Sequence, residues 1–403
     1  MRGRALLLAG GLLVAKSLGG DGISDRARKL HFSSLVVDTH DDTTQRLLDA
    51  GFDLGARHRD GSIDIPRMRE GGLGGLFFSV WLPSKVTGAA AVQRALDQID
   101  AVREHVRRHP EDLLLATTAE QVRKARREGK IAALLGVEGG HMIASDLAVL
   151  RLYAALGVRY MTLTHSGNGE WADSSTDQPA HNGLTAFGRE VLREMNRLGM
   201  IVDISHVSDK TFYDALEASQ APVFASHSSC RALCDAPRNM TDRMMRDLAA
   251  KGGVVQINYH VGFLSQAFRD AEKSDPKINE QITQQVKQRC KGDNEGCVLI
   301  EGDKVTREFV ARGLLPRVQY TKIIEHIDHA VKVAGADHVG LGSDFDGANM
   351  PYGMEDASRL PKITEALLKK GYSEGDVRKI LGENTLRVMS EAERVSRRLN
   401  AQN

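Results

Sequence analysis

One rhythm runs through this chain of 403 residues from about residue 30 onward: a short apolar run, a turn, and then an amphipathic helical pattern. The apolar runs are almost continuous, as in parallel strands whose outer face is covered by helices. Residues 185–198, with their apolar side chains on one stripe, illustrate the helical half of the unit. Eight such units predict one α/β domain over residues 31–392, a (β/α)8 or TIM barrel. The predicted strands are residues 35–38, 76–82, 131–137, 160–164, 200–204, 222–226, 254–258 and 338–341.

The charge balance limits the class of partner. The chain has 54 Lys and Arg residues against 53 Asp and Glu residues, a formal net charge of +1, and 41% of its residues are hydrophobic. This is the composition of a folded globular protein rather than of a disordered chain. The lack of a basic excess argues against nucleic acid or an anionic membrane surface as the main partner.

The first twenty residues predict a signal peptide. Arg2 and Arg4 precede an apolar run over residues 5–15, which is too short to span a bilayer as a stable anchor. We therefore expect an exported protein, periplasmic or extracellular. The alternative is an uncleaved N-terminal helix and a cytoplasmic location, because no clear A-x-A site follows. No later segment reaches the length of a transmembrane helix, so no stable membrane span is expected.

One segment interrupts the rhythm. Residues 262–318, between the seventh and eighth predicted strands, are long, polar and rich in Lys, Gln, Glu and Asp. An insertion there leaves from the catalytic end of a barrel, which favours an inserted loop that acts as a lid or an assembly surface, or else a merely solvated excursion. It holds Cys290 and Cys297, and whether these pair is open. None of the four cysteines forms the C-x-x-C pair of a zinc finger or a thioredoxin-like centre.

Polar side chains follow the predicted strands at the point where each strand ends. His40 and Asp42 follow the first strand two residues apart, so both point the same way in an extended segment. An imidazole and a carboxylate suit a zinc-like divalent ion. Glu138 follows the third strand beside glycines, where a carboxylate is costly unless it pairs with a cation or a metal. The alternatives are a polar turn at residues 40–42 and a turn or helix-capping glutamate at 138.

Three histidines each follow a strand of their own: His165 the fourth, His206 the fifth and His227 the sixth. All strands of a parallel barrel end at the same mouth, so these residues are expected to converge without any local motif, although one such histidine alone is more often a satisfied core residue. Asp344 follows the eighth strand and could shuttle a proton at that mouth. Arg238, shortly after the sixth strand, could bind a substrate carboxylate through its planar fork. The alternatives are a glycine-rich turn and a surface arginine.

Several other features of the sequence do not indicate a catalytic motif. Residues 325–329 read Glu-His-Ile-Asp-His but lack the H-E-x-x-H order of a zincin, and we expect them on the exposed face of an amphipathic helix. His141 is expected to be a loop residue. The chain contains no G-x-G-x-x-G, Walker loop or G-x-S-x-G motif, which argues against a dinucleotide enzyme, a P-loop enzyme or a serine hydrolase.

Together these motifs resemble the membrane (renal) dipeptidase family of the amidohydrolase superfamily, from about residue 36 to residues 383–387. Two features depart from the family pattern: the insertion 262–318 is longer than expected, and the loop 166–171 matches loosely. The resemblance is carried by D-x-H-x-D at 38–42, Asp64-Ile65-Pro66-Arg67 with residues 71–78, and residues 136–140, 163–165, 196–206, 226–229, 238–239 and 342–347.

The resemblance implies a zinc-dependent dipeptidase with two Zn2+ ions per subunit in a (β/α)8 barrel, acting on dipeptides with a free C-terminal carboxylate. It implies that a hydroxide between the metals attacks the peptide carbonyl, and by analogy with relatives it suggests a homodimer. It assigns His40 and Asp42 to one zinc, His206 and His227 to the other, Glu138 to both, His165 to the oxyanion, Arg238 to the substrate carboxylate and Asp344 to proton transfer.

The alternatives are hydrolysis of N-acyl amino acids or β-lactams on the same scaffold, or a catalytically silent metal-binding homologue. Asp344 argues against the silent homologue, since it serves proton transfer rather than metal binding. The sequence leaves open the preferred side chains, the stereochemistry at the second residue, the native metal and the oligomeric state.

Overall fold

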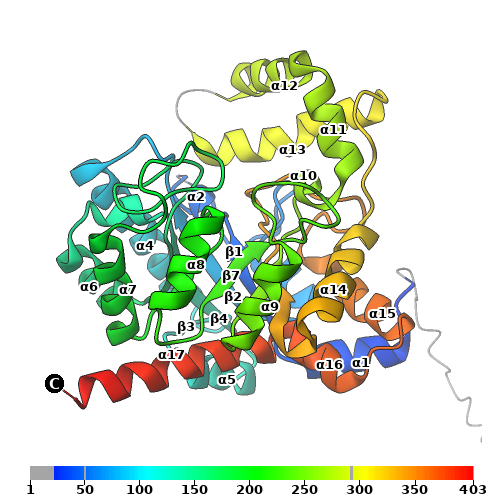
Figure 1. The fold of residues 1–403 in the computed structure, drawn as a ribbon. Helices are drawn as coiled ribbons and strands as arrows, with labels where there is room; N and C mark the ends of the chain where they lie inside the picture. Colours follow the sequence, from blue (N-terminus) through cyan, green and yellow to red (C-terminus); the bar gives the residue numbers. More distant parts are fainter. Residues whose placement is uncertain (1–21, 50, 291–293, 403) are drawn as a thin grey trace, which may run out of the picture.

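The computed structural model describes residues 22–49, 51–290 and 294–402, so the predicted signal peptide lies outside the described residues. Parallel strands form a closed barrel, and helices surround it (Figure 1). Neighbouring strands follow the order β2-β1-β9-β8-β7-β6-β5-β4, and a pairing of β2 with β4 closes the ring. The predicted TIM barrel is confirmed. No described helix is long and apolar enough to cross a membrane.

All eight predicted strands are present, with ends shifted by a few residues. β2 begins three residues earlier than predicted, because two glycines after its first residue interrupt the apolar run. The prediction missed the short strand β3, which pairs with the first half of β4 beside the place where β5 begins, outside the closed ring. The strands are β1 (Val36–Asp41), β2 (Leu73–Trp81), β3 (Leu113–Leu115), β4 (Ile131–Glu138), β5 (Val158–Thr162), β6 (Ile201–Asp203), β7 (Phe224–Ser228), β8 (Val254–Ile257) and β9 (Val339–Leu341).

The helices begin and end where local chemistry dictates. Helix α7 begins after Thr185, whose hydroxyl accepts a hydrogen bond from Gly188 N, and it ends at Gly199 in the left-handed conformation. The α-helices of the barrel are α1 (Asp25–Ser33), α2 (Thr44–Leu47), α3 (Ile65–Glu70), α4 (Gly88–Arg108), α5 (Ala119–Arg127), α6 (Leu147–Leu156), α7 (Ala186–Leu198), α8 (Asp209–Ala218), α9 (Asp242–Ala250), α14 (Thr321–Ala334), α15 (Pro361–Lys369), α16 (Glu374–Arg378) and α17 (Asn384–Asn400). Short 3-10 or π turns span η1 (Gly140–Ile143), η2 (Ala336–His338), η3 (Ala357–Arg359) and η4 (Lys379–Glu383).

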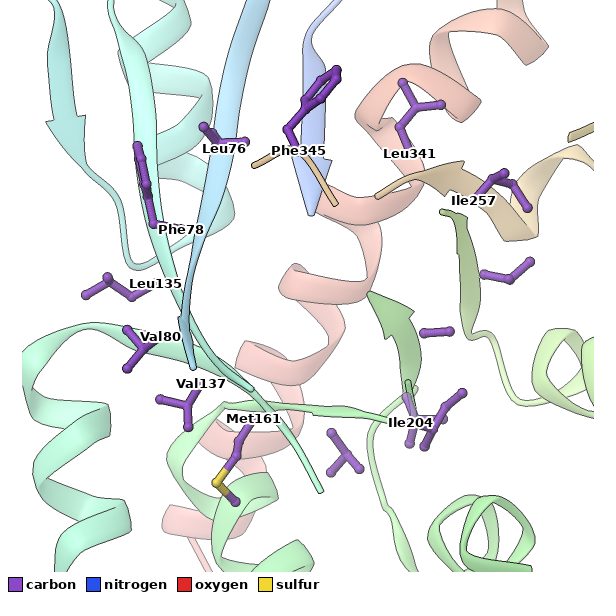
Figure 2. Close-up of a cluster of buried hydrophobic side chains, with 14 of the residues drawn as sticks. Leu76, Phe78, Val80, Leu135, Val137, Met161, Ile204, Ile257, Leu341 and Phe345 are labelled. Atoms are coloured by element: carbon purple, nitrogen blue, oxygen red, sulfur yellow. The ribbon is translucent and has the colours of Figure 1, made fainter. Parts of the chain in front are cut away.

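Alternate residues of the strands contribute to two buried layers. One layer contains strand residues such as Leu76 and Leu135 (Figure 2). Helix residues such as Ile99 of α4 belong to the same buried cluster. The other joins Phe77 and Tyr160 to Leu386 of α17, the helix that lies across one end of the barrel (Figure 1). The filled interior leaves the opposite end of the barrel for a site.

Most of the described residues of the insertion are helical, so it is not an irregular loop. It lies at the end of the molecule opposite α17 (Figure 1). It carries its own small apolar cluster, which includes Phe268, Val305 and Phe309. Cys290 and Cys297 form a disulfide. Its helices are α10 (Val261–Leu264), α11 (Gln266–Ser274), α12 (Pro276–Arg289) and α13 (Glu295–Ala311).

The prediction for residues 325–329 was wrong at His326. This side chain of α14 is fully buried: its Nδ1 accepts a hydrogen bond from Cys230 N at 3.0 Å, and its Nε2 donates to Leu264 O at 3.1 Å. The polar residues next to His326 in the sequence led to the prediction of an exposed position, although the side chain lies on the helix face that packs toward the barrel. Burial lowers the pKa of His326 to about 4.

Acid is therefore expected to weaken the fold through His326. The pKa of this histidine is 6.5 ordinarily and about 4 in the folded protein, so between these values the unfolded chain binds more protons. Its contribution to stability is complete above pH 6.5 and falls as the pH decreases, by about 2 kcal/mol at pH 5. Urea unfolding at pH 7 and pH 5 measures this loss, which should be smaller by that amount in His326→Gln. Equal losses in the two proteins would contradict the assignment.

Candidate active site

The polar residues predicted from the sequence meet at the mouth of the barrel. His40 and His227 lie within β1 and β7, and Glu138 is the last residue of β4. His165 and His206 lie in the loops after β5 and β6. Asp42 directly follows β1, Asp344 follows β9, and Arg238 lies in the loop between β7 and α9.

Glu138 is at the centre of this group. Its Oε2 lies 3.5 Å from His40 Nε2, while its Oε1 lies 2.8 Å from His206 Nε2 and 3.2 Å from His227 Nε2. Asp42 Oδ1 lies 3.6 Å from His40 Nε2, on the Oε2 side. The two oxygens of one buried carboxylate therefore face two separate sets of side chains.

Unusual backbone conformations hold two of the residues in place. His206 and Asp344 have φ angles of 66° and 64°, in the left-handed region that residues other than glycine rarely adopt. Asp344 N donates a hydrogen bond to His40 O at 3.0 Å, which ties the loop after β9 to β1. Gly347 approaches so closely that a Cβ there would lie 1.6 Å from Asp42 Oδ2. Strain of this kind is characteristic of sites that need exact side-chain placement.

A shell of hydrogen bonds orients the imidazole rings. Tyr160 Oη lies 2.8 Å from His40 Nδ1, and Ser226 Oγ lies 2.8 Å from His227 Nδ1. Ser226 Oγ in turn donates to Asp203 Oδ2 at 2.6 Å. With their Nδ1 atoms engaged, His40 and His227 direct Nε2 toward Glu138.

The ionisation states follow from burial and from neighbouring charge. Burial alone would raise the pKa of Glu138, but His40, His165, His206 and His227 outweigh it and hold that pKa well below its usual range. Burial lowers the pKa values of His206 and His227 far below 6.5, so both rings are neutral at pH 7. Neutral imidazole is the form that binds metal ions.

The site opens into a cavity of about 250 Å³. This volume suits a small molecule rather than a long peptide. Arg238 contributes a buried positive charge: its Nη2 donates to His227 O at 3.1 Å, and its buried Nε has no hydrogen-bond partner among the described residues. The lining residues are Asp42, Trp81, Glu138, His165, His206, His227, Arg238, His260, Phe263, Leu299, Asp344, Gly347 and Ala348.

The donor set fits metal ions. His40 Nε2 and Asp42 Oδ1 are buried and make no hydrogen bond to a described residue. The Nε2 atoms of His206 and His227 lie 3.0 Å apart and both face Glu138 Oε1. Imidazole nitrogens and carboxylate oxygens that converge in this way suit zinc-like ions. Three groups of residues each offer ligand atoms that lie within 4.8 Å of one another. The groups are His40, Glu138 and His227; Glu138, His165 and His206; and His40, Asp42 and Asp344.

Sequence reasoning missed several residues of the site. His260 lines the cavity three residues beyond β8, so the rule that placed the other histidines could have found it. Asn258, whose Nδ2 donates to Asp344 Oδ2 at 2.8 Å, gave no signal of its own. His141 lies in the turn η1 rather than in an irregular loop, and burial lowers its pKa to about 4.

A family model described as membrane dipeptidase (peptidase family M19) matches residues 24–403. The chain belongs to the membrane dipeptidase family. The expected resemblance is confirmed, and the chain is a metallo-dipeptidase, a hydrolase of peptide bonds.

Solved structures agree with this assignment. The probable dipeptidase PvdM from Pseudomonas aeruginosa is 26% identical, with a TM-score of 0.77, and the match covers 92% of this chain and 98% of that one. A metallopeptidase from Rhodobacter sphaeroides, liganded with a phosphinate mimic of the dipeptide L-Ala-D-Ala, is 26% identical, with a TM-score of 0.72 and coverage of 89% and 99%. An amidohydrolase from Pseudomonas aeruginosa, 23% identical with a TM-score of 0.68 and coverage of 91% and 98%, shares the fold.

Proposed function

We propose that this metallo-dipeptidase holds two zinc ions and hydrolyses dipeptides that carry a free C-terminal carboxylate. The observation that carries the proposal is the division of Glu138 between two sets of side chains: Oε2 faces His40, and Oε1 faces His206 and His227. The phosphinate dipeptide mimic in the Rhodobacter sphaeroides relative supports a dipeptide as the substrate.

His40 and Asp42 would hold one ion, His206 and His227 the other, and Glu138 would contact both. The neutral rings of His206 and His227 and the ionised carboxylate of Glu138 are the protonation states that metal binding requires. Burial would lower the pKa of His40, but Tyr160 and Glu138 raise it well above 6.5, so an ion bound to His40 would displace a proton. When bound, such ions supply Lewis acidity, which polarises a carbonyl group and acidifies water.

Arg238 is proposed to bind the substrate carboxylate. Burial lowers the pKa of Arg238 to about 10, so the guanidinium stays charged at pH 7. A buried cation at the cavity wall selects an anionic group that can accept two parallel hydrogen bonds. The free carboxylate of a dipeptide provides such a group, and the cavity volume of about 250 Å³ favours a short substrate.

His165 and Asp344 are proposed to act on the reacting atoms. Burial lowers the pKa of His165, so its ring is neutral and can donate a hydrogen bond to the oxyanion that forms during attack. Asn258 fixes the carboxylate of Asp344, which can accept a proton from the attacking water and deliver it to the leaving amine.

The insertion is proposed to act as a lid, and the protein to be exported. Leu299 of α13 lines the cavity, so the helix of the insertion contributes a wall to the site. The Cys290–Cys297 disulfide is in keeping with an oxidising compartment outside the cytoplasm.

Replacing Arg238 by Ala tests the substrate proposal. We expect kcat/KM for free-acid dipeptides to fall by roughly 10²-fold, mainly through KM, because a buried charge pair with the substrate is lost. Carboxy-amidated dipeptides, which never made this pair, should be cleaved equally slowly by both proteins. Arg231→Ala is the matched control, since Arg231 pairs with Asp209 at 2.7 Å outside the cavity. Unchanged discrimination against amidated substrates in Arg238→Ala would remove Arg238 from this role.

A further inference from the structure

A second group of metal-ligating side chains lies away from the barrel mouth. Asp53, in the segment that follows α2, meets His105 and His109 at the C-terminal end of α4. One potential ligand atom from each of these residues lies within 4.8 Å of the other two. None of the three lines the cavity of the active site. The group is therefore independent of the proposed hydrolytic site.

The two histidines are presented together by the helix. They are four residues apart, and residues at this spacing lie on one face of a helix. His109 N donates to His105 O at 3.1 Å, so this spacing is kept although His109 is the C-cap of α4. The two rings are 6.3 Å apart and inclined by only 27°. Helical histidines spaced in this way are a common element of zinc sites.

His105 is the most buried residue of the three. The residue is only 3% exposed, and its Nδ1 is buried with no hydrogen bond to a described residue. A buried polar atom without a hydrogen-bond partner is costly, and a bound ion would give it a partner. Burial also lowers the pKa of His105, which keeps the ring neutral and able to bind a metal at pH 7.

Asp53 supplies a fixed and ionised carboxylate. Its Oδ1 accepts hydrogen bonds from Gly55 N at 2.9 Å and from His109 Nε2 at 2.8 Å. The Gly55 hydrogen bond, with the nearby His109, holds the pKa of Asp53 below its usual range. The Asp53 side chain is 56% exposed, so an ion can enter from solvent.

The surroundings attract cations. Asp49, Asp97, Asp100 and Glu104 line the same hollow as the three residues, while Arg108 there is paired with Glu104 at 2.9 Å. Carboxylates gathered in a concave surface raise the local concentration of cations. A tetrahedral zinc ion, with ligand distances of about 2.0–2.1 Å, needs ligand atoms roughly 3.3 Å apart. The pair His109 Nε2 and Asp53 Oδ1, at 2.8 Å, already approaches this separation.

We propose that Asp53, His105 and His109 bind a divalent transition-metal ion of the zinc class at a site separate from the barrel. Two imidazoles and one carboxylate, with an open side toward solvent, suit such an ion. The ion replaces the proton between His109 Nε2 and Asp53 Oδ1, and it fastens the segment after α2 to α4.

The metal content of the full-length, zinc-loaded protein tests this site. We expect Asp53→Asn, His105→Gln and His109→Gln each to hold one zinc ion per chain fewer than the wild type after gel filtration, as measured by mass spectrometry of the metal. Dipeptide hydrolysis should be unchanged. Zinc added to protein whose barrel site is already filled should raise the melting temperature of the wild type, and of none of these variants.

Asp97→Asn is the matched control, because it removes a charge from the same hollow without removing a proposed ligand. It should retain the wild-type zinc content. The proposal is overturned if the His109→Gln protein, whose change is at a partly exposed position, binds as much zinc as the wild type. It is equally overturned if Asp97→Asn loses as much zinc as the ligand variants, which would indicate diffuse attraction rather than a site.

Discussion

Glu138→Gln is expected to lose nearly all dipeptide hydrolysis, with kcat reduced by roughly 10³-fold or more. The substitution keeps the size of the side chain but removes the negative charge that faces His40 on one side and His206 and His227 on the other. An amide has one oxygen instead of two, so it cannot serve both sets of side chains. Steady-state kinetics beside metal analysis measure both consequences, and the metal content should fall with the turnover.

The fold should survive this change. The amide keeps the volume of the side chain and can still hydrogen-bond to one of the surrounding histidines, so the barrel is expected to fold. The metal-free protein should lose some stability, because these histidines stabilise the negative charge that the substitution removes. Circular dichroism and thermal unfolding provide the check. Glu170→Gln, the same substitution at an exposed residue outside the cavity, is the matched control and should be fully active. A fully active, well-folded Glu138→Gln protein would contradict the two-metal site.

Asp344→Asn is expected to reduce kcat by about 10²–10⁴-fold, with little change in KM. An amide retains the size of the side chain and a partner for Asn258, but it cannot accept the proton of the attacking water. Because proton transfer occurs in the transition state and not in substrate binding, the loss should lie in kcat. Rates over a range of dipeptide concentrations separate the two parameters.

Asp346→Asn, two residues farther along the same loop, is the contrasting variant. Asp346 accepts hydrogen bonds from Ser62 N and from the Thr43 hydroxyl at 2.7 Å, and it faces no reacting atom. Its replacement should lower the melting temperature and leave the turnover of folded protein largely intact. If Asp344→Asn acted only on KM, or lost no more turnover than Asp346→Asn, Asp344 would not be the proton carrier.

The barrel and its mouth could be predicted because both follow from simple periodicity. Apolar runs such as residues 131–137 predict buried parallel strands, and in a parallel barrel the C-terminal ends of all strands lie at the same mouth. That rule alone places His165, His206 and His227 near one another, far apart as they are in the chain. The prediction needs no knowledge of side-chain contacts, because the strand topology alone determines where these residues lie.

The remaining features depend on tertiary contacts that no local pattern records. Leu299 reaches the cavity only because α13 folds back over the barrel mouth. One apolar residue in a polar insertion does not indicate from the sequence that it lines an active site. His326 sits among charged neighbours in the sequence, yet the packing of α14 buries it. The three-residue strand β3 is too short to show periodicity and exists because β4 offers it an edge.

The proposed substrates of this site are dipeptides with a free carboxylate. The most direct test of this proposal offers zinc-loaded protein a mixed library of L-L and L-D dipeptides, with carboxy-amidated copies of each, and follows every member by mass spectrometry. We expect rapid loss of the free-acid dipeptides while their amidated copies persist. Persistence of every free-acid dipeptide in the presence of protein shown to hold two metal ions would contradict the proposal.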